Sequence, residues 1–165
     1  LKFLILLIIL DLNSFNSVRL FVDEFLKLSL PLHGLINNAG LMNSDRYTTP
    51  DGLEVVMTAN HLSHFLLSNL LLSQLNDTAH DELNKLYQSK ADTEGAIECN
   101  DNTDNKIKNE NKKTNIEPTE EEIESCYGRI ITLSSALHKI PNKFNFNDIM
   151  SENDYTVFGT YAQAK

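Results

Sequence analysis

The chain alternates short apolar runs with longer stretches in which apolar residues recur at helical spacing. The runs at 1–10 and 32–36 predict buried strands of a parallel sheet, and the β-branched run at 128–135 predicts a further strand. Between them, apolar residues three or four positions apart predict helices over about 14–28 and 51–75. Strand, helix and strand in succession imply a right-handed crossover, so the pattern predicts an α/β fold.

The first run, at 1–10, admits two interpretations. Ten residues are too few for a membrane span of about 20 residues, so the run is either a buried strand or a signal-peptide core. We favour the strand, because no small-residue cleavage site is evident after it and Asp11 comes directly after it. The chain begins with Leu1 rather than Met and ends on Lys165, which leads us to expect a fragment.

Both predicted helices carry start signals. Asn13 or Ser14 can cap the first helix. The second can begin at the Thr-Pro pair that precedes Asp51, or at Asp51 with Glu54 three residues later. Asn60 falls on the apolar stripe of this second helix, so we expect its amide to be hydrogen-bonded.

Charge is unevenly distributed along the chain. The net charge is −9, and the segment 76–126 alone holds 14 acidic and 6 basic residues. Helix can continue to about Tyr87, but 88–125 has too few apolar residues to offset the entropy of ordering, so we predict a disordered insertion there. The lack of clustered Lys and Arg argues against nucleic acid as a partner.

Cysteines and histidines give no metal signature. Cys99 and Cys126 lack metal-ligand spacing and do not make a disulfide framework, so a reducing compartment is expected. His61 and His64 stand three apart without a carboxylate or further histidine to complete a metal site, which favours a structural role.

Polar residues come after the later strands. Asn38, Ala39 and Gly40 succeed the strand at 32–36, where they form either an ordinary turn or part of a ligand site at the carboxyl edge of the sheet. Ser134 and Ser135 end the strand at 128–135.

Tyr161 and Lys165 stand four apart, which on a helix places them on one face. A neighbouring ammonium lowers the pKa of a phenol from about 10 and prepares it for acid–base catalysis near neutral pH. Such a pair also occurs by chance on many helix surfaces.

Four separated features together resemble the short-chain dehydrogenase/reductase family. They are Asn37-Asn38-Ala39-Gly40 after a strand, Asn60 in the run NHLSHF, Ser135 at a strand end, and Tyr161-x-x-x-Lys165. The runs DGLE at 51–54 and FNDI at 146–149 are most similar to retinol dehydrogenase-like members. The resemblance covers roughly 9–75 and 127–165. It implies that 1–165 is part of one doubly wound Rossmann-type domain with the insertion at 88–125 inside it.

The resemblance also implies catalytic roles. Tyr161 would be the acid/base, and Lys165 would lower its pKa and bind the nicotinamide ribose. Ser135, rather than Ser134, would hold the substrate oxygen. Asn60 would position a water that links Lys165 to solvent as a proton relay.

The cofactor implied is NADP or NAD, with NADP favoured by resemblance. Asp11 would contact the adenine, and Asn38, Ala39 and Gly40 would line the adenosine side. The chain contains no G-x-x-x-G-x-G sequence, the turn on which pyrophosphate binding in this fold relies. We therefore expect 1–165 alone to bind dinucleotide weakly or not at all, and to aggregate through exposed strand edges.

The implied reaction is hydride transfer to or from a small apolar carbonyl or alcohol, such as a retinoid or lipid aldehyde. An alternative hypothesis is a non-catalytic scaffold whose acidic insertion binds a basic partner. A cytoplasmic location and membrane association at the endoplasmic reticulum or mitochondria, through a segment before Leu1, are both compatible with the sequence. It leaves the oligomeric state open.

Overall fold

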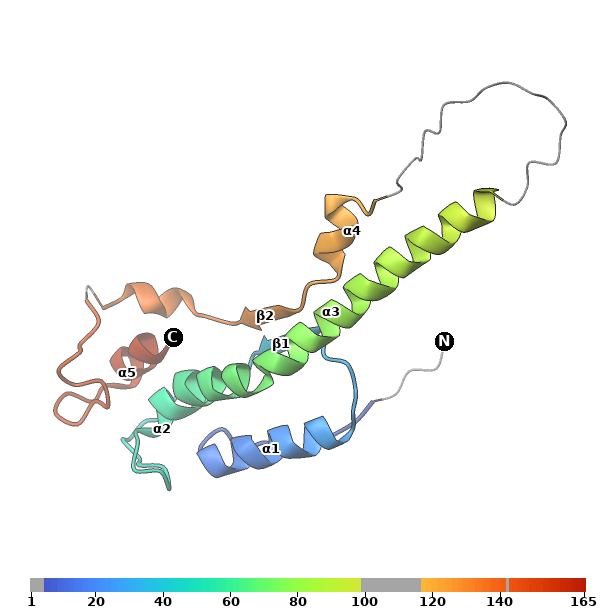
Figure 1. Cartoon of the computed structure of the whole chain (residues 1–165). Coiled ribbons are helices and arrows are strands. Elements are labelled where there is room, and N and C mark those ends of the chain that lie inside the picture. Colours follow the sequence, from blue (N-terminus) through green and yellow to red (C-terminus); the bar gives the residue numbers. More distant parts are fainter. Residues whose placement is uncertain (1–4, 99–116, 142) are drawn as a thin grey trace, which may run out of the picture.

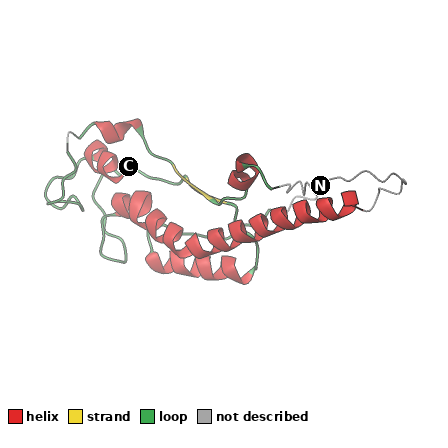
Figure 2. Cartoon of the chain, turned by 45° about the horizontal axis from the view of Figure 1, so that its top comes forward, coloured by secondary structure: helices red, strands yellow, loops and turns green. Residues whose placement is uncertain are grey.

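The computed structural model describes residues 5–98, 117–141 and 143–165 of the chain. Figures 1 and 2 show an arrangement dominated by one long helix, with the other elements gathered along part of its length. In chain order the elements are α1 (Phe15–Lys27), β1 (Gly34–Asn37), α2 (Val55–Met57), the π-helical turn η1 (Thr58–Leu62), α3 (Ser63–Glu98), α4 (Glu120–Ser125), β2 (Arg129–Thr132), the 3-10 turn η2 (Ala136–Lys139) and α5 (Val157–Ala164).

The sheet of the described residues consists of β1 and β2, which pair in parallel. Their register sets Gly34 opposite Arg129 and Asn37 opposite Thr132. The predicted α/β class with a parallel sheet is confirmed. Because the strands are parallel, both carboxyl ends lie at the same edge, and the segments after β1 and β2 emerge side by side.

The main core joins α1 to α3. Val18 and Val22 of α1 pack against Leu67 and Leu71 of α3, and all four are buried. Burying an aliphatic side chain of this size contributes about 1.5–3 kcal/mol, so this seam is a major source of stability. The helix predicted at 14–28 is confirmed, with Ser14 as its cap.

A second apolar cluster holds the last helix in place. Ala164 of α5 packs with Val56 and Met57 of α2, and Tyr161 lies against the same cluster. The helix that carries Tyr161 is α5, which begins at Val157. This packing fixes the face of α5 that bears the tyrosine.

The strand predicted at 1–10 is not formed over the described residues 5–10. That segment belongs to no strand, and Ile5 and Leu7 are 91% and 94% exposed. A strand requires hydrogen bonds from a neighbour, and in the described ranges only β1 and β2 pair as strands. The apolar pattern indicates a segment that can enter a sheet, but it does not show whether a neighbouring strand is present to pair with it.

The second helix starts later than predicted. Its cap is Glu54, whose carboxylate accepts hydrogen bonds from the N–H groups of Val56 and Met57 at 2.9 and 2.7 Å. Asp51 instead accepts a hydrogen bond from Phe15 N–H at the start of α1, at 2.8 Å. Between them Gly52 adopts φ 80°, which bends the chain and delays the helix.

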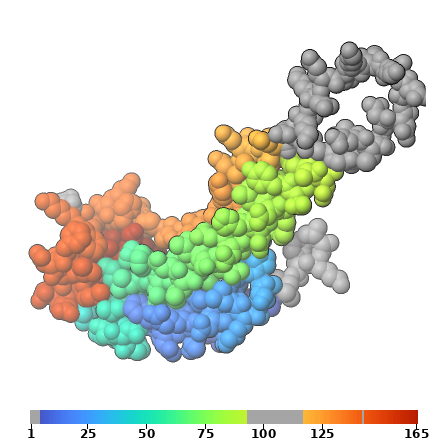
Figure 3. Space-filling view, in the orientation of Figure 1, coloured from blue at the N-terminus to red at the C-terminus, as the bar shows by residue number. Residues whose placement is uncertain are grey.

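The long helix also ends later than predicted, at Glu98 rather than near 75 or, with the continuation allowed by the sequence, near Tyr87. By length and composition the stretch 55–92 could cross a membrane, but 56% of its most apolar window is buried. Burial of this kind is typical of a core helix. Figure 3 shows the later part of α3 extending beyond the body of the molecule, with α4 against it.

The predicted disordered insertion at 88–125 is wrong at both edges. Residues 88–98 belong to α3 and 120–125 form α4. An ion pair between Lys90 Nζ and Glu122 Oε1, at 2.8 Å, joins the two helices. Thr119 and Glu122 form a reciprocal capping box that starts α4.

The middle of the predicted insertion, at 99–116, lies outside the described residues. The hypothesis that this acidic segment binds a basic partner concerns mainly those residues and stays a prediction.

We predict that the Lys90–Glu122 pair can be detected by titration. Hydrogen bonds from Lys90 first, and then from Thr119 N–H, lower the pKa of the Glu122 carboxyl below its ordinary value of 4.5. The pair therefore adds stability above pH 4.5, and this contribution is lost as the pH falls through the lowered pKa. Carboxyl NMR should show the Glu122 pKa rising toward 4.5 in Lys90→Met.

Lys85→Met is the matched control, because Lys85 pairs with Glu82 on the same helix at 2.9 Å. It should leave the Glu122 titration unchanged. An unaltered Glu122 pKa in Lys90→Met would mean that the pair does not form in solution.

Candidate active site

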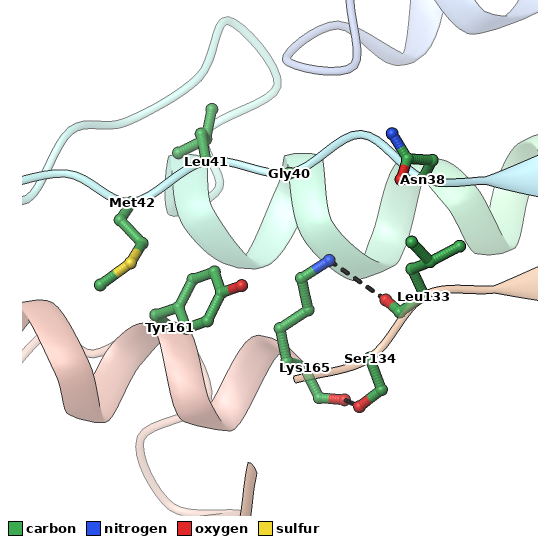
Figure 4. Close-up of a pocket in the computed structure, with 8 residues that line it drawn as sticks. All are labelled: Asn38, Gly40, Leu41, Met42, Leu133, Ser134, Tyr161 and Lys165. Atoms are coloured by element: carbon green, nitrogen blue, oxygen red, sulfur yellow. Dashed lines mark hydrogen bonds between the residues drawn. The ribbon is translucent and has the colours of Figure 1, made fainter. Parts of the chain in front are cut away.

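A pocket of about 460 Å³ opens at the carboxyl edge of the two strands. The segments after β1 and β2 form two of its walls and α5 closes a third (Figure 4). Its lining residues are Asn38, Gly40, Leu41, Met42, Leu133, Ser134, Tyr161 and Lys165. The fold thus brings together three of the predicted polar site residues, Asn38, Tyr161 and Lys165, from separate segments of the chain.

Asn60 lies behind this pocket and holds one of its walls. Its side-chain Oδ1 accepts from Leu41 N–H at 2.7 Å, and its Nδ2 donates to the Leu41 carbonyl at 2.9 Å. The expectation that a buried Asn60 is hydrogen-bonded is confirmed. Through these two bonds η1 fixes the loop that leaves β1.

The π-helical turn that carries Asn60 was not foreseen. In η1 the N–H of Ser63 bonds to the carbonyl of Thr58, five residues back instead of four. Single π turns inside α-helices are frequent at functional sites. The spacing of apolar residues cannot predict a π turn. Apolar residues in an ordinary helix already recur at either three or four positions, so one extra residue in a turn does not stand out.

Gly40 is the point at which Asn60 and Lys165 meet the β1 loop. A Cβ added there would lie 3.0 Å from Lys165 Nζ and 3.1 Å from Asn60 Oδ1. Both distances are tighter than ordinary van der Waals contact. Because Gly40 has no side chain, the end of the Lys165 side chain can lie against this loop.

Lys165 is held by the two residues that follow β2. Its Nζ donates to the Leu133 carbonyl at 3.2 Å, and its own carbonyl accepts from Ser134 Oγ at 2.9 Å. Tyr161 lies on the same face of α5 with its ring turned into the pocket (Figure 4). Among the described residues its hydroxyl has no hydrogen-bond partner.

The two serines are used differently. Ser134 lines the pocket, whereas Ser135 caps η2 and its Oγ accepts from Leu137 N–H at 3.3 Å. The substrate-binding role assigned to Ser135 stays a prediction. The link from Ser134 to the Lys165 carbonyl was missed, since no sequence signal distinguishes adjacent serines.

Only some of the residues expected to line the adenosine side of the cofactor lie at the pocket. Asn38 lines the pocket, and Ala39 next to it does not. Asp11 lies just before α1, where its carboxylate accepts from Asn13 N–H at 2.9 Å. Their roles in binding a cofactor stay predictions.

His64 lies one turn after Asn60 and is almost completely buried, whereas His61 is exposed. Burial, as the largest cause, lowers the pKa of His64, and the charges of Lys165 and His61 lower it further. A hydrogen bond with the Asn60 carbonyl acts in the opposite direction. No group of three metal-binding side chains occurs within 5–98, 117–141 and 143–165.

No protein-family model matches the chain, but curated relatives do. Human polyprenol dehydrogenase is 31% identical over 155 residues, which are 94% of this chain and 34% of the relative. The short-chain dehydrogenase TIC 32 A, chloroplastic, of Brassica napus is 47% identical over 72 residues, 44% of this chain and 22% of the relative. Retinol dehydrogenase 12 of Bos taurus is 47% identical over 70 residues, 42% of this chain and 22% of the relative.

The chain belongs to the short-chain dehydrogenase/reductase family. Its similarity to several retinol dehydrogenases confirms the predicted retinol dehydrogenase-like membership. The chain spans between 22% and 34% of the length of the relatives named above.

The structural comparison agrees with this family. A solved structure of an uncharacterized protein from Mycobacterium paratuberculosis matches with a TM-score of 0.55 and 27% identity, over 94% of this chain and 38% of that one. The predicted Rossmann-type fold class is thereby confirmed for the part of the short-chain dehydrogenase/reductase fold that this chain spans.

Gly40→Ala should displace Lys165 without unfolding the protein. The new Cβ would press on the flexible end of Lys165 and on an Asn60 side chain that two hydrogen bonds hold, so the lysine yields. We expect a changed side-chain NMR signal for Lys165 and a melting temperature close to that of the parent.

Gly34→Ala provides the matched control, because its Cβ would lie an ordinary 3.7 Å from the Arg129 carbonyl. It should leave the Lys165 signal in place. The same Lys165 signal in Gly40→Ala and the parent would contradict the contact between Gly40 and Lys165.

Proposed function

We propose that the whole protein that carries this chain is an NAD(P)-dependent oxidoreductase. It would transfer a hydride between the nicotinamide cofactor and the carbonyl or alcohol carbon of an apolar substrate. The observation that carries the proposal is the convergence of Tyr161, Lys165 and Asn60 at one edge of a parallel sheet. The relatives' names, which are those of dehydrogenases, support the same class of reaction.

Tyr161 is proposed as the acid/base. Its hydroxyl, without a partner in the described part of the chain, would donate a proton to a carbonyl oxygen in reduction and accept one from an alcohol in oxidation. Lys165 would stabilise the negative charge that develops on the phenolic oxygen, because an adjacent cation favours the ionised form. Ser135 is proposed to hold the substrate oxygen.

We propose that the pocket holds the nicotinamide–ribose part of a dinucleotide. Lys165 supplies hydrogen-bond donors to it, and Gly40 lacks the Cβ that would narrow it. A bound dinucleotide would supply or take up the hydride. The glycine-rich phosphate turn has no counterpart in this sequence, and the proposal of NADP over NAD rests on resemblance alone.

An apolar substrate is favoured by the remaining walls. Leu41, Met42 and Leu133 line the pocket, and Met42 lies on the Tyr161 side of it (Figure 4). Met42 is 39% exposed, so a ligand can reach its thioether. Methionine adapts its shape to different apolar partners, which suits retinoid-like or other lipid carbonyls.

Tyr161→Phe tests the chemistry. Loss of a general acid/base should lower kcat of the whole protein by about 10²–10⁴-fold on retinaldehyde-like and simple carbonyl substrates. Tyr155→Phe is the control, since Tyr155 is not among the residues that line the pocket and its hydroxyl is already bonded to the Asn43 carbonyl at 3.0 Å. Turnover by Tyr161→Phe within about tenfold of the parent would contradict the role given to Tyr161.

Met42→Gln tests the substrate class. A polar amide in this wall should lower kcat/KM for long apolar carbonyls by about 10-fold or more, the usual effect of a mismatch in an apolar pocket. Short carbonyl substrates that do not reach Met42 should be little affected. Met42→Leu, which conserves volume and polarity, should keep both activities. An equal loss for short and long substrates would argue against contact between Met42 and the apolar chain.

A further inference from the structure

His64 is a buried ionisable side chain for which the proposed chemistry has no use. It is 5% exposed, and it lies one helical turn after Asn60 in the segment where η1 passes into α3. A polar side chain removed from water to this extent requires a partner. Because His64 lies one turn from Asn60, whose amide holds the Leu41 backbone, the identity of that partner is informative.

The partner is the main-chain carbonyl of Asn60, which lies 3.3 Å from His64 Nδ1. A carbonyl oxygen can only accept, so Nδ1 must carry the proton in this contact. The imidazole thus inserts a side-chain hydrogen bond into the helical ladder at the π turn. Insertions of this kind are a recognised cause of local departures from α-helical geometry.

The charged groups that face His64 come from two elements. Lys165 approaches from the end of α5 and His61 lies on the same helical segment, and both lower the pKa of His64 in addition to the larger effect of burial. At neutral pH the ring is therefore uncharged, with its proton on Nδ1. An uncharged ring adds no positive charge beside Lys165.

We infer that His64 is a positioning residue for the site: its Nδ1–H holds the Asn60 carbonyl, and with it the π turn that sets the Asn60 amide against the Leu41 backbone. This inference rests on the proposed function for its kinetic consequences. The amide of Asn60 binds both polar backbone groups of Leu41, so a rotation of the turn would move the loop that contains Gly40. Lys165 touches that loop and would move with it.

Two substitutions separate hydrogen bonding from packing. His64→Leu removes the donor and keeps an apolar side chain. His64→Asn keeps a donor at the same place, because Asn69 of this helix donates from Nδ2 to the Phe65 carbonyl four residues back, at 2.8 Å. Asn69→Leu is the control, since it removes a bond of the same type from an exposed position.

In the whole protein we expect His64→Leu to lower kcat about tenfold or more and to change the pH profile of kcat, with KM little altered. His64→Asn should restore most of the rate, and Asn69→Leu should leave it unchanged. Equal rates for His64→Leu and the parent would overturn the inference, as would equal losses in His64→Leu and His64→Asn.

Two readouts do not depend on turnover. Nitrogen NMR of the imidazole should show a neutral Nδ1–H tautomer near neutral pH; an Nε2–H tautomer or an imidazolium would overturn the inference. Because the pKa of His64 is lowered on folding, the parent should lose stability as the pH falls below 6.5, and His64→Asn should lose less. A parent that turns over no carbonyl with either cofactor would refute the proposed function, while these readouts would still decide the role of His64.

Discussion

The two hydrogen bonds between the Asn60 amide and the Leu41 backbone are the constraint on which the site depends. They join a loop that leaves the sheet to the π turn at the start of the long helix, through both polar groups of one side chain. Leaving such a buried amide unpaired costs about 1–3 kcal/mol, so the pairing of Asn60 with Leu41 is strongly favoured over an unpaired amide. Because Gly40 precedes Leu41, these hydrogen bonds also fix the position of Gly40, against which the end of the Lys165 side chain lies.

The helices were predictable because the contacts that stabilise them recur with a local period. Val18 and Val22 lie one turn apart and meet Leu67 and Leu71, also one turn apart, so each helix shows its buried face in its own sequence. The prediction for the run at 1–10 failed for the opposite reason. A strand forms only where a neighbouring strand supplies hydrogen bonds, and apolar residues such as Ile5 do not indicate whether such a neighbour is present.

The site was predictable to the extent that sheet topology decides it. Parallel strands deliver the segments after them to one edge, so Gly40 and Ser134 were bound to lie near each other once β1 and β2 paired. The details were not predictable, because they depend on competition for single hydrogen bonds. Ser135 is engaged by Leu137 N–H, and the π turn at Asn60 depends on contacts that no spacing rule records.

The later part of α3 and α4, which flank the residues at 99–116 in the sequence, lie away from α5, the helix that carries Tyr161 (Figure 1). The Lys90–Glu122 pair brings these two helices together, and the entropy of closing a longer loop grows only slowly with its length. The hydrogen bond from Arg129 N–H to the His33 carbonyl, at 3.1 Å, then starts β2 in register. With that register fixed, the Leu133 carbonyl reaches Lys165 however long the connection is.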